Sequence, residues 1–357
     1  MRTIAAVVLG ALLLTTSCAA PPAAIPKARE EATPSARDQA DMIAQEAVDA
    51  RVTMLLHLDR LRGFRFSQRL MVLGGWADAL EGTELDPFVD VQRAFIAARA
   101  SHNGQVAVIL QHTAQEERVI RSILMLHQKW RAVHPRRTAP PAAKVDSTVG
   151  AGAEPPARLR ELEARVALLR DVVGERAEGR FPDPARLPFP AAYRTMRNDF
   201  SHAIGPVLVA APRPGIVAIL PPERIFAAFR LMEIGGLPAP RGDEAMVFRA
   251  WDPRSSIQNG PLWSGDVRYA DVMFSFDGEG SSTLAFRAVC TSAEAAREQA
   301  ERLTAQVEEA QTVAFGGARL RLFDFIQFRA ENDRVKMRAH LHADDVDWLV
   351  TMTMNPL

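Results

Sequence analysis

The pattern of apolar and polar residues along the chain predicts antiparallel strand pairs that alternate with helices. In the first such passage two apolar segments flank Ser101-His102-Asn103-Gly104, in which Asn-Gly is a strong hairpin signal. Apolar residues then recur at helical spacing. The predicted elements are a hairpin (91–99 and 105–111), a helix (114–130), a second hairpin (206–211 and 215–220) and a second helix (222–234).

A second passage shows the same order of elements. Its first helix opens with the capping box Thr291-x-x-Glu294, which satisfies free N–H groups at a helix start. The predicted elements are a hairpin (267–276 and 282–290), a helix (291–311), a second hairpin (322–329 and 334–342) and a closing helix (343–352). We therefore expect an α+β fold of two similar units, each hairpin-helix-hairpin-helix, with its helices on one face of an antiparallel sheet.

The remaining segments complete the predicted domain organisation. The first unit (41–235) begins with a strand near 52–56 and a helix at 64–80, and it carries an insertion at 131–200. The opening of this insertion is rich in Pro, Ala and Gly and is expected to be partly disordered. A helix at 158–178 has one apolar seam, which either docks on its own domain or forms a short coiled coil with a partner. The sequence predicts a connecting loop at 236–266 and the second unit at 267–357.

The N-terminus has the layout of an export signal. Arg2 is followed by an uncharged apolar run at 4–14, which is shorter than the 20 or so residues that span a bilayer. The run leads into Leu14-Thr15-Thr16-Ser17-Cys18, which resembles the lipobox of bacterial lipoproteins, although that family prefers Leu where Thr15 stands. The resemblance implies a signal peptide at 1–17, cleavage before Cys18 and acylation of Cys18, including a palmitate-type chain. The alternative is an ordinary secretory signal followed by a chance cysteine.

The resemblance also bears on location. Ala19, rather than Asp, follows the cysteine, and in lipoproteins this favours anchoring to the outer membrane, with the domain facing the periplasm or the cell surface. Residues 18–40 are rich in Ala and Pro and are expected to form a flexible tether. Cys290 is the second of the two cysteines. If Cys18 carries lipid, the domain holds no internal disulfide.

Part of the mature region resembles a group of uncharacterised bacterial lipoproteins. The residues that carry this weaker resemblance are Leu58-Asp59-Arg60-Leu61-Arg62-Gly63 and Asp86-Pro87-Phe88-x-Asp90-Val91. The resemblance covers about the first third of the mature chain, and it implies no activity.

One strand carries a run that resembles a metal-binding motif. His340-Leu341-His342-Ala343-Asp344-Asp345 is similar to the H-x-H-x-D-H motif of metallo-hydrolases, but Asp345 replaces the last histidine and only twelve residues follow it. Alternation places the histidines on a face with several cations, which disfavours binding another cation. We therefore expect no metal site and assign the aspartates to the first turn of the closing helix.

The same face predicts a different kind of site. With one cation of the neighbouring strand it forms a basic surface that suits anionic lipid headgroups, a polyanion or an acidic partner. The alternatives are a solvated sheet face or an edge strand whose charges prevent pairing. The residues of this predicted surface are Arg329, Arg334, Lys336, Arg338, His340 and His342.

Nothing in the sequence predicts a catalytic residue or a cofactor. The chain has no G-x-S-x-G, no Walker phosphate loop, no dinucleotide-binding glycine motif and no C-x-x-C. Lys plus Arg equals Asp plus Glu at 43 each, so the overall charge does not favour nucleic acid. We expect a membrane-anchored, non-catalytic protein that binds a partner or organises the envelope. An envelope hydrolase with a dispersed active site and a carrier of an apolar ligand remain alternatives.

Overall fold

The computed structural model describes a large part of the chain after residue 49. The described residues are 50–64, 67, 80–99, 106–133, 166–167, 183–197, 203–233, 236–240, 242–257, 263–276, 280–310, 312–315, 318–321, 326–344 and 346. The predicted signal peptide (1–17), Cys18 and the tether (18–40) lie outside these residues. Most of the helices predicted at 64–80 and 158–178, and the opening of the insertion, also lie outside them.

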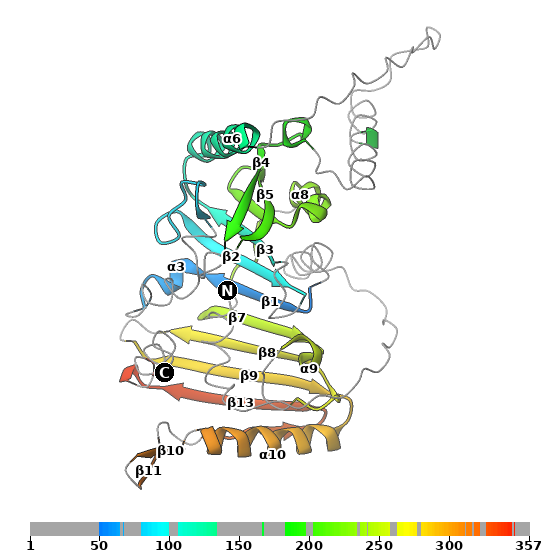
Figure 1. The fold of residues 1–357 in the computed structure, drawn as a ribbon. Helices are drawn as coiled ribbons and strands as arrows, with labels where there is room; N and C mark the ends of the chain where they lie inside the picture. The colour runs from blue at the N-terminus through cyan, green and yellow to red at the C-terminus, as the bar shows by residue number, and fades with distance from the viewer. Residues whose placement is uncertain are drawn as a thin grey trace.

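The fold is built on one antiparallel sheet of 11 strands, which runs from β12 at one edge to β4 at the other (Figure 1). Its order is β12-β13-β9-β8-β7-β1-β2-β3-β6-β5-β4, and a separate two-stranded sheet pairs β10 with β11. The strands are β1 (Val52–His57), β2 (Val91–Ala98), β3 (Val106–His112), β4 (Ala191–Arg197), β5 (Ala203–Arg213), β6 (Ile216–Leu220), β7 (Glu244–Trp251), β8 (Val267–Phe276), β9 (Ser282–Cys290), β10 (Thr312–Phe315), β11 (Ala318–Arg321), β12 (Arg329–Glu331) and β13 (Arg334–Leu341).

Two long helices lie at opposite ends of the large sheet: α6 near β4 and β5, and α10 below β13 (Figure 1). Shorter helical segments follow individual strands. The helices are α3 (Leu58–Leu61), α6 (Glu116–Val133), α8 (Ile225–Leu231), α9 (Pro253–Ser256) and α10 (Ala293–Ala310), with 3-10 turns η1 (Pro184–Arg186) and η2 (Pro222–Arg224). No helix in the described part of the chain is long and apolar enough to cross a membrane.

The core consists of two apolar clusters, one on each face of the sheet. The larger cluster joins alternate residues of both halves of the sheet to α6, through Val119 and Ile123, and to α10, through Leu303 and Val307. The smaller cluster lies on the other face, where Ile225 and Phe229 of α8 cover the strands around β3, β5 and β6. α6 and α8 therefore lie on opposite faces of the sheet, and β6 is buried on both faces.

The strand order is similar on the two sides of the contact between β1 and β7. On one side β1, β2 and β3 form a meander, α6 follows, and β6 returns beside β3. On the other side β7, β8 and β9 form a meander, α10 follows, and β13 returns beside β9. β1 and β7 pair antiparallel from Val52 opposite Ala250 to Leu56 opposite Met246. This pairing joins the two halves into one sheet.

The mixed α and β composition and the antiparallel sheet were predicted from the sequence and are confirmed. Several finer predictions were wrong. β7 lies within 236–266, which was expected to be a loop, and β4 lies within the insertion. Of the strand expected at 322–329, residues 326–328 belong to no strand, Arg329 begins β12, and 322–325 lie outside the described residues. The helices do not all lie on one face, because the central strands of the first half are apolar on both sides and need cover on both.

His112, at the end of β3, is a titratable group in the core of the first half. Its side chain is 5% exposed, and burial lowers the pKa of the imidazole. The charges of Glu116 and Asp90 act in the opposite direction but do not cancel the effect of burial. The folded protein therefore disfavours the protonated form of His112 more than the unfolded chain does.

We expect His112 to make stability depend on pH. Its contribution is fully present above the unfolded pKa, near 6.5, and is lost as the pH falls below it, because the unfolded chain then binds the proton more readily. His112→Gln removes this titration, so the substitution should cost less stability at pH 5 than at pH 8. Urea denaturation of both proteins at the two pH values measures this, and an equal cost at both would contradict the assignment.

Candidate functional site

The predicted basic surface lies on the exposed side of β13. Residues of this strand alternate between exposed and buried, with Val335, Met337 and Leu341 in the core and their neighbours facing out. Lys336 lies opposite Arg329 of β12. Strand alternation and hairpin pairing thus bring the predicted residues together as the sequence indicated. The exposed members are Arg329, Arg334, Lys336, Arg338, His340 and His342.

β9, on the other side of β13, adds a cation that the sequence analysis missed. Arg287 lies directly opposite Lys336, and Ala285 lies opposite Arg338. The row continues to Asp271 of β8 and Arg249 of β7. The signal was present in β9, where Arg287 is the single charged residue. The sequence did not show that Arg287 lies beside β13, because α10 separates β9 from β13 along the chain.

Two cations of this surface, Arg287 and Lys336, form close ion pairs with carboxylates. Arg287 donates from Nε to Asp271 Oδ1 at 2.8 Å and from Nη2 to Oδ2 at 3.1 Å. These hydrogen bonds are the main reason why the pKa of Arg287 is raised, and the Asp271 side chain is 4% exposed. The pair therefore belongs to the structure of the sheet. On the β12–β13 hairpin, Lys336 forms an ion pair with Glu331.

Tyr269 borders the pair formed by Arg287 and Asp271. The Arg287 guanidinium lies 6.0 Å from the centroid of the Tyr269 ring. Burial, followed by the negative charge of Asp271, raises the pKa of the Tyr269 hydroxyl. Arg287 is therefore held both by a carboxylate and by an aromatic ring, which fixes the side of the surface nearest β8.

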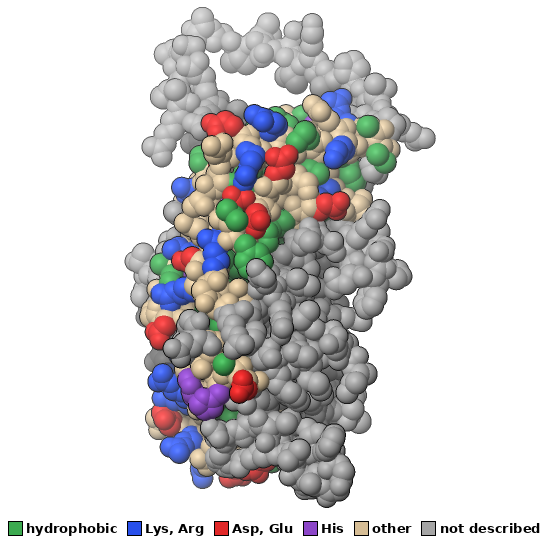
Figure 2. Space-filling view, turned by 90° about the vertical axis from the view of Figure 1, so that its left-hand side faces the viewer, with side chains coloured by type: hydrophobic (Ala, Val, Ile, Leu, Met, Phe, Trp, Pro, Cys, Tyr) green, Lys and Arg blue, Asp and Glu red, His purple; other side chains and the backbone are tan. Residues whose placement is uncertain are grey.

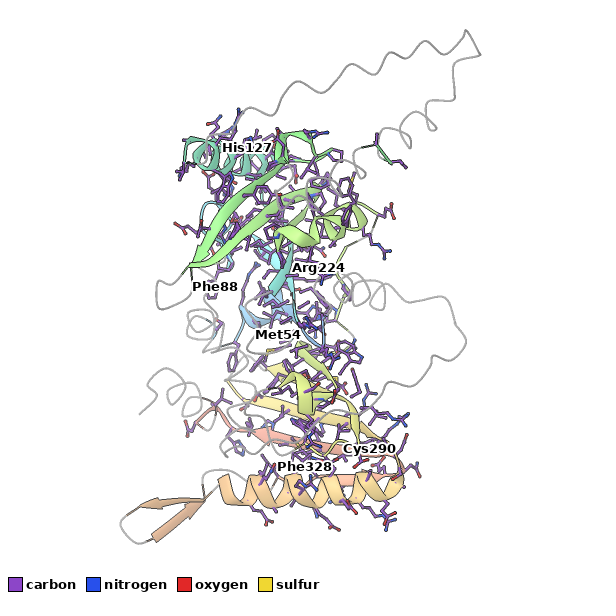
Figure 3. All side chains as sticks on the ribbon, turned by 45° about the vertical axis from the view of Figure 1, so that its right-hand side comes forward. Met54, Phe88, His127, Arg224, Cys290 and Phe328 are labelled. Carbon is purple, nitrogen blue, oxygen red and sulfur yellow. The ribbon has the colours of Figure 1, made fainter. Side chains whose placement is uncertain are left out.

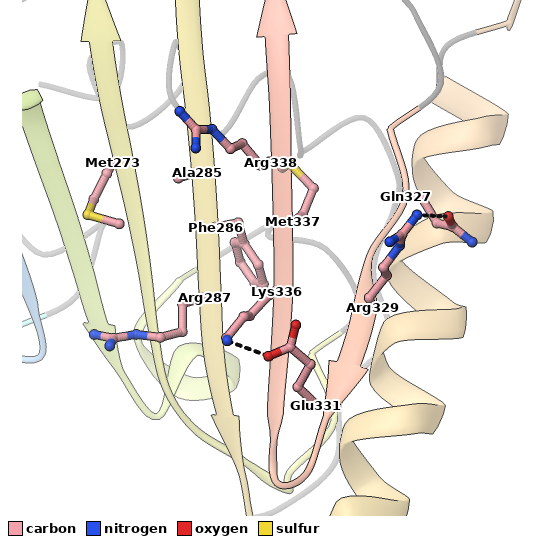
Figure 4. A pocket seen from close by; sticks show the side chains of 10 residues that line it. All are labelled: Met273, Ala285, Phe286, Arg287, Gln327, Arg329, Glu331, Lys336, Met337 and Arg338. Atoms are coloured by element: carbon pink, nitrogen blue, oxygen red, sulfur yellow. Dashed lines mark hydrogen bonds and ion pairs between the residues drawn. The ribbon is translucent and has the colours of Figure 1, made fainter. Parts of the chain in front are cut away.

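Arg338 differs from these neighbours. Among the residues that the structure describes, it has no hydrogen bond or ion pair, and its side chain extends from β13 over β9 (Figure 4). Within the described residues, the guanidinium of Arg329 makes a hydrogen bond only to the neutral Gln327, at 3.5 Å between Nη2 and Oε1. Arg334 makes a longer contact of 3.9 Å from its Nε to Oδ1 of Asp333. The surface thus keeps positive charge that no described carboxylate neutralises.

A shallow hollow of about 600 Å³ lies at this surface (Figure 4). The small side chain of Ala285 leaves space between Met273 and Arg338, and Arg287 and Lys336 line the hollow beside them. Met273 and Ala285 are half-buried and apolar. The hollow therefore combines an apolar floor with cationic walls, which suits a ligand that carries negative charge beside an apolar part.

His340 and His342 extend the surface beyond Arg338. Their rings are 5.1 Å apart in an edge-to-face arrangement. Figure 2 shows histidine side chains among Lys and Arg side chains in the lower part of that view. In the described part of the chain, no three His, Cys, Asp or Glu residues come together as metal ligands would.

Cys290 lies at the end of β9, where the sequence suggested either a reactive thiol or a small buried hydrophobe. It is 2% exposed and belongs to the larger core cluster, on the side of α10 (Figure 3). Burial raises the pKa of the thiol, and the charges of Asp266 and Asp333 add to this. A thiol with a raised pKa forms less thiolate, which favours the structural role.

The two segments that resemble uncharacterised lipoproteins contact each other. Arg62 donates from Nη2 to the carbonyl oxygens of Val91 at 2.6 Å and Val89 at 3.2 Å. Asp90 accepts from the backbone N–H of Asp86 at 2.8 Å and from Arg118 Nη2 at 2.6 Å. The segments therefore fix the turn before β2 and attach it to α6. This gives them a structural role that requires no activity.

Comparison of the chain with protein families, with curated proteins and with solved structures finds no match. The surface on β13 and β9 must therefore be interpreted from its own chemistry.

We expect Asp90→Ala to lower the free energy of unfolding by about 2 kcal/mol, because the substitution leaves the Asp86 N–H and Arg118 without their acceptor. Asp90→Asn keeps one acceptor oxygen and should cost less. Chemical denaturation of the two variants and the unchanged protein measures this. If Asp90→Ala is as stable as the unchanged protein, Asp90 does not have the structural role in the turn that we assign to it.

Proposed function

We propose that this protein is a lipid-anchored envelope protein that binds a negatively charged partner through the open sheet face of β9 and β13, without catalysis. The observation that carries the proposal is Arg338, an exposed cation with no described partner beside a hollow that has an apolar floor. A charge in such a place gains most from an anionic group brought by another molecule.

The chemistry of the hollow favours binding over the alternatives. It is open and lined by Arg and Lys, whereas a carrier of an apolar ligand needs a deep apolar cavity. Among the described residues that line it there is no histidine, and the one carboxylate, Glu331, is held by Lys336. General acid and base catalysis needs groups that are free to exchange protons with a substrate.

The binding proposal predicts that one charge reversal removes the partner. Full-length tagged protein, the Arg338→Glu variant and the Arg302→Glu variant are each used to capture partners from detergent-solubilised membranes. Arg302 is an exposed cation of α10, which packs on the opposite face, so its reversal is a matched control. We expect an acidic partner with the unchanged protein and with Arg302→Glu, and about tenfold less of it with Arg338→Glu.

If all three proteins recover the same amount of the partner, the partner does not bind through the β13 surface and the proposal is wrong. Recovery of a partner without net negative charge would contradict the proposed chemistry even if Arg338→Glu reduced its amount.

Anchoring at Cys18 is the second part of the proposal. It is supported by the apolar run at 4–14 and by the lipobox-like residues before Cys18. Several acyl chains on one cysteine hold a protein stably on a bilayer, whereas one chain holds it marginally. Ala19 supports the outer membrane as the site of attachment, with the domain in the periplasm or on the cell surface.

We expect the protein to incorporate labelled palmitate and to sediment with outer-membrane vesicles on a density gradient. Cys18→Ser should abolish the label, since the acylated sulfur is gone, while Cys290→Ser should leave it unchanged. Label retained in Cys18→Ser would show that the lipobox interpretation is wrong.

The division into two similar units also remains a proposal. It is supported by the strand order on either side of the β1–β7 contact and by the position of α6 and α10 on one face. Because β1 and β7 run antiparallel, the two halves are expected to be related by a two-fold rotation normal to the sheet. An experimental structure in which this rotation does not superpose β1-β2-β3-β6 on β7-β8-β9-β13 would contradict it.

A further inference from the structure

In the described part of the chain, the outward face of the second half of the sheet has no helical cover like that of the first half. In the first half α8 packs on this face and closes the smaller core cluster. Met273 of β8 packs at the margin of that cluster. Beyond it, no helix in the described residues covers the outward side chains of β9 and β13, where Arg334, Lys336 and Arg338 are exposed.

The spacing of the cations on β13 matches the spacing of side chains on a helix. Alternate residues of a strand lie about 6.8 Å apart, and residues four apart on an α-helix are separated by about 6 Å along its axis. The cations Arg334, Lys336 and Arg338 occupy three alternate positions of one strand, and His340 occupies the fourth. A helix of about 14 residues is as long as this row, which is about 20 Å.

The apolar positions lie beside this row. Ala285 and Met273 are half-buried neighbours of Arg338 on β9 and β8, and Val289 lies opposite Arg334. A helix about 10 Å wide that lies along β13 also reaches β9. It would place apolar side chains on Ala285 and Val289 and acidic side chains opposite the cations.

The surface fits a helix better than a strand or a membrane. An added strand would bind the backbone edge of β13 and not the side chains of its outward face, and β12 already occupies that edge at 334–336. Glu331 and Asp333 stand among the cations, and they would repel a uniformly anionic lipid surface. A helix can place its carboxylates opposite the cations alone.

We infer that the partner of this surface is an acidic amphipathic helix of about 14 residues, with carboxylates at four-residue spacing, which packs along β13 and β9 and covers the hollow between Met273 and Arg338. This inference rests on the proposed function and narrows it to one kind of partner.

Two synthetic peptides test the pattern directly. Both have about 14 residues and the same composition; one carries glutamate at every fourth position with leucine on the adjacent face, and the other has the glutamates rearranged. Each is labelled with a fluorophore and titrated with the lipidated full-length chain in neutral lipid nanodiscs. We expect the patterned peptide to bind about tenfold more tightly than the rearranged one, and more weakly as salt rises.

The charge variants locate the binding site. Arg338→Glu should weaken binding of the patterned peptide about tenfold, whereas Arg302→Glu should leave it unchanged. Circular dichroism of the two variants shows that both are folded. Equal binding of the two peptides overturns the inference, as does Arg338-dependent binding to vesicles of phosphatidylglycerol without binding to the patterned peptide.

The outcomes separate this inference from the proposed function. If an acidic partner is captured through Arg338 but the patterned peptide binds no better than its rearranged form, the inferred helical partner is wrong and the proposed basic binding surface is retained. If neither capture of the partner nor binding of the peptide depends on Arg338, both this inference and the proposed function are wrong.

Discussion

The antiparallel pairing of β1 with β7 is the contact on which the rest of the structure depends. Five consecutive residue pairs, from Val52–Ala250 to Leu56–Met246, join two groups of strands into one sheet. Without this contact each half would expose the edge of a largely apolar strand, and such an edge invites aggregation. Its presence also aligns the faces of the two halves, so that α6 and α10 share one apolar cluster.

Each half of the continuous sheet has two faces, so there are four areas that either are covered or remain in contact with water. α6 and α10 cover both areas of one face, and α8 covers the first half of the other. On the fourth area the outward residues of β13 are charged and those of β9 are half-buried. Charged side chains let a sheet face remain in contact with water. The excess of cations over carboxylates, with Arg338 unpaired among the described residues, supports the proposal that this face binds a negatively charged partner.

The sequence predicted those parts of the fold that local signals specify. The bounds of β8 and β9 were predicted to the residue, because alternation and a Gly-containing turn define that hairpin. β7 was missed because most of its residues are buried, so it shows no alternation, and it lies in a segment rich in Gly and Pro. β4 was missed because it follows a long insertion, and its pairing with β5 spans segments that the pattern did not connect.

The candidate site, too, was predicted where local signals specify it and missed where it depends on pairing between distant strands. The outward residues of β13, from Arg334 to His340, followed from period-two alternation, and Arg329 followed from the hairpin. The contribution of Arg287 and the apolar floor at Ala285 depends on β9 pairing with β13, across α10 in the chain. Pairing between distant strands is decided by how helices and strands pack together, which a single sequence does not show.

The most direct test of the central claim, that the open face of β9 and β13 is a binding surface, is photo-cross-linking from within the hollow. The substitution Ala285→p-benzoylphenylalanine places the reactive group on its floor, and the same substitution at Arg302 on α10 serves as the control. We expect irradiation of cells that express the full chain to give one discrete adduct from position 285, which maps to an acidic segment of another protein. Position 302 should give no adduct. No adduct from position 285, or the same adducts from both positions, would contradict it.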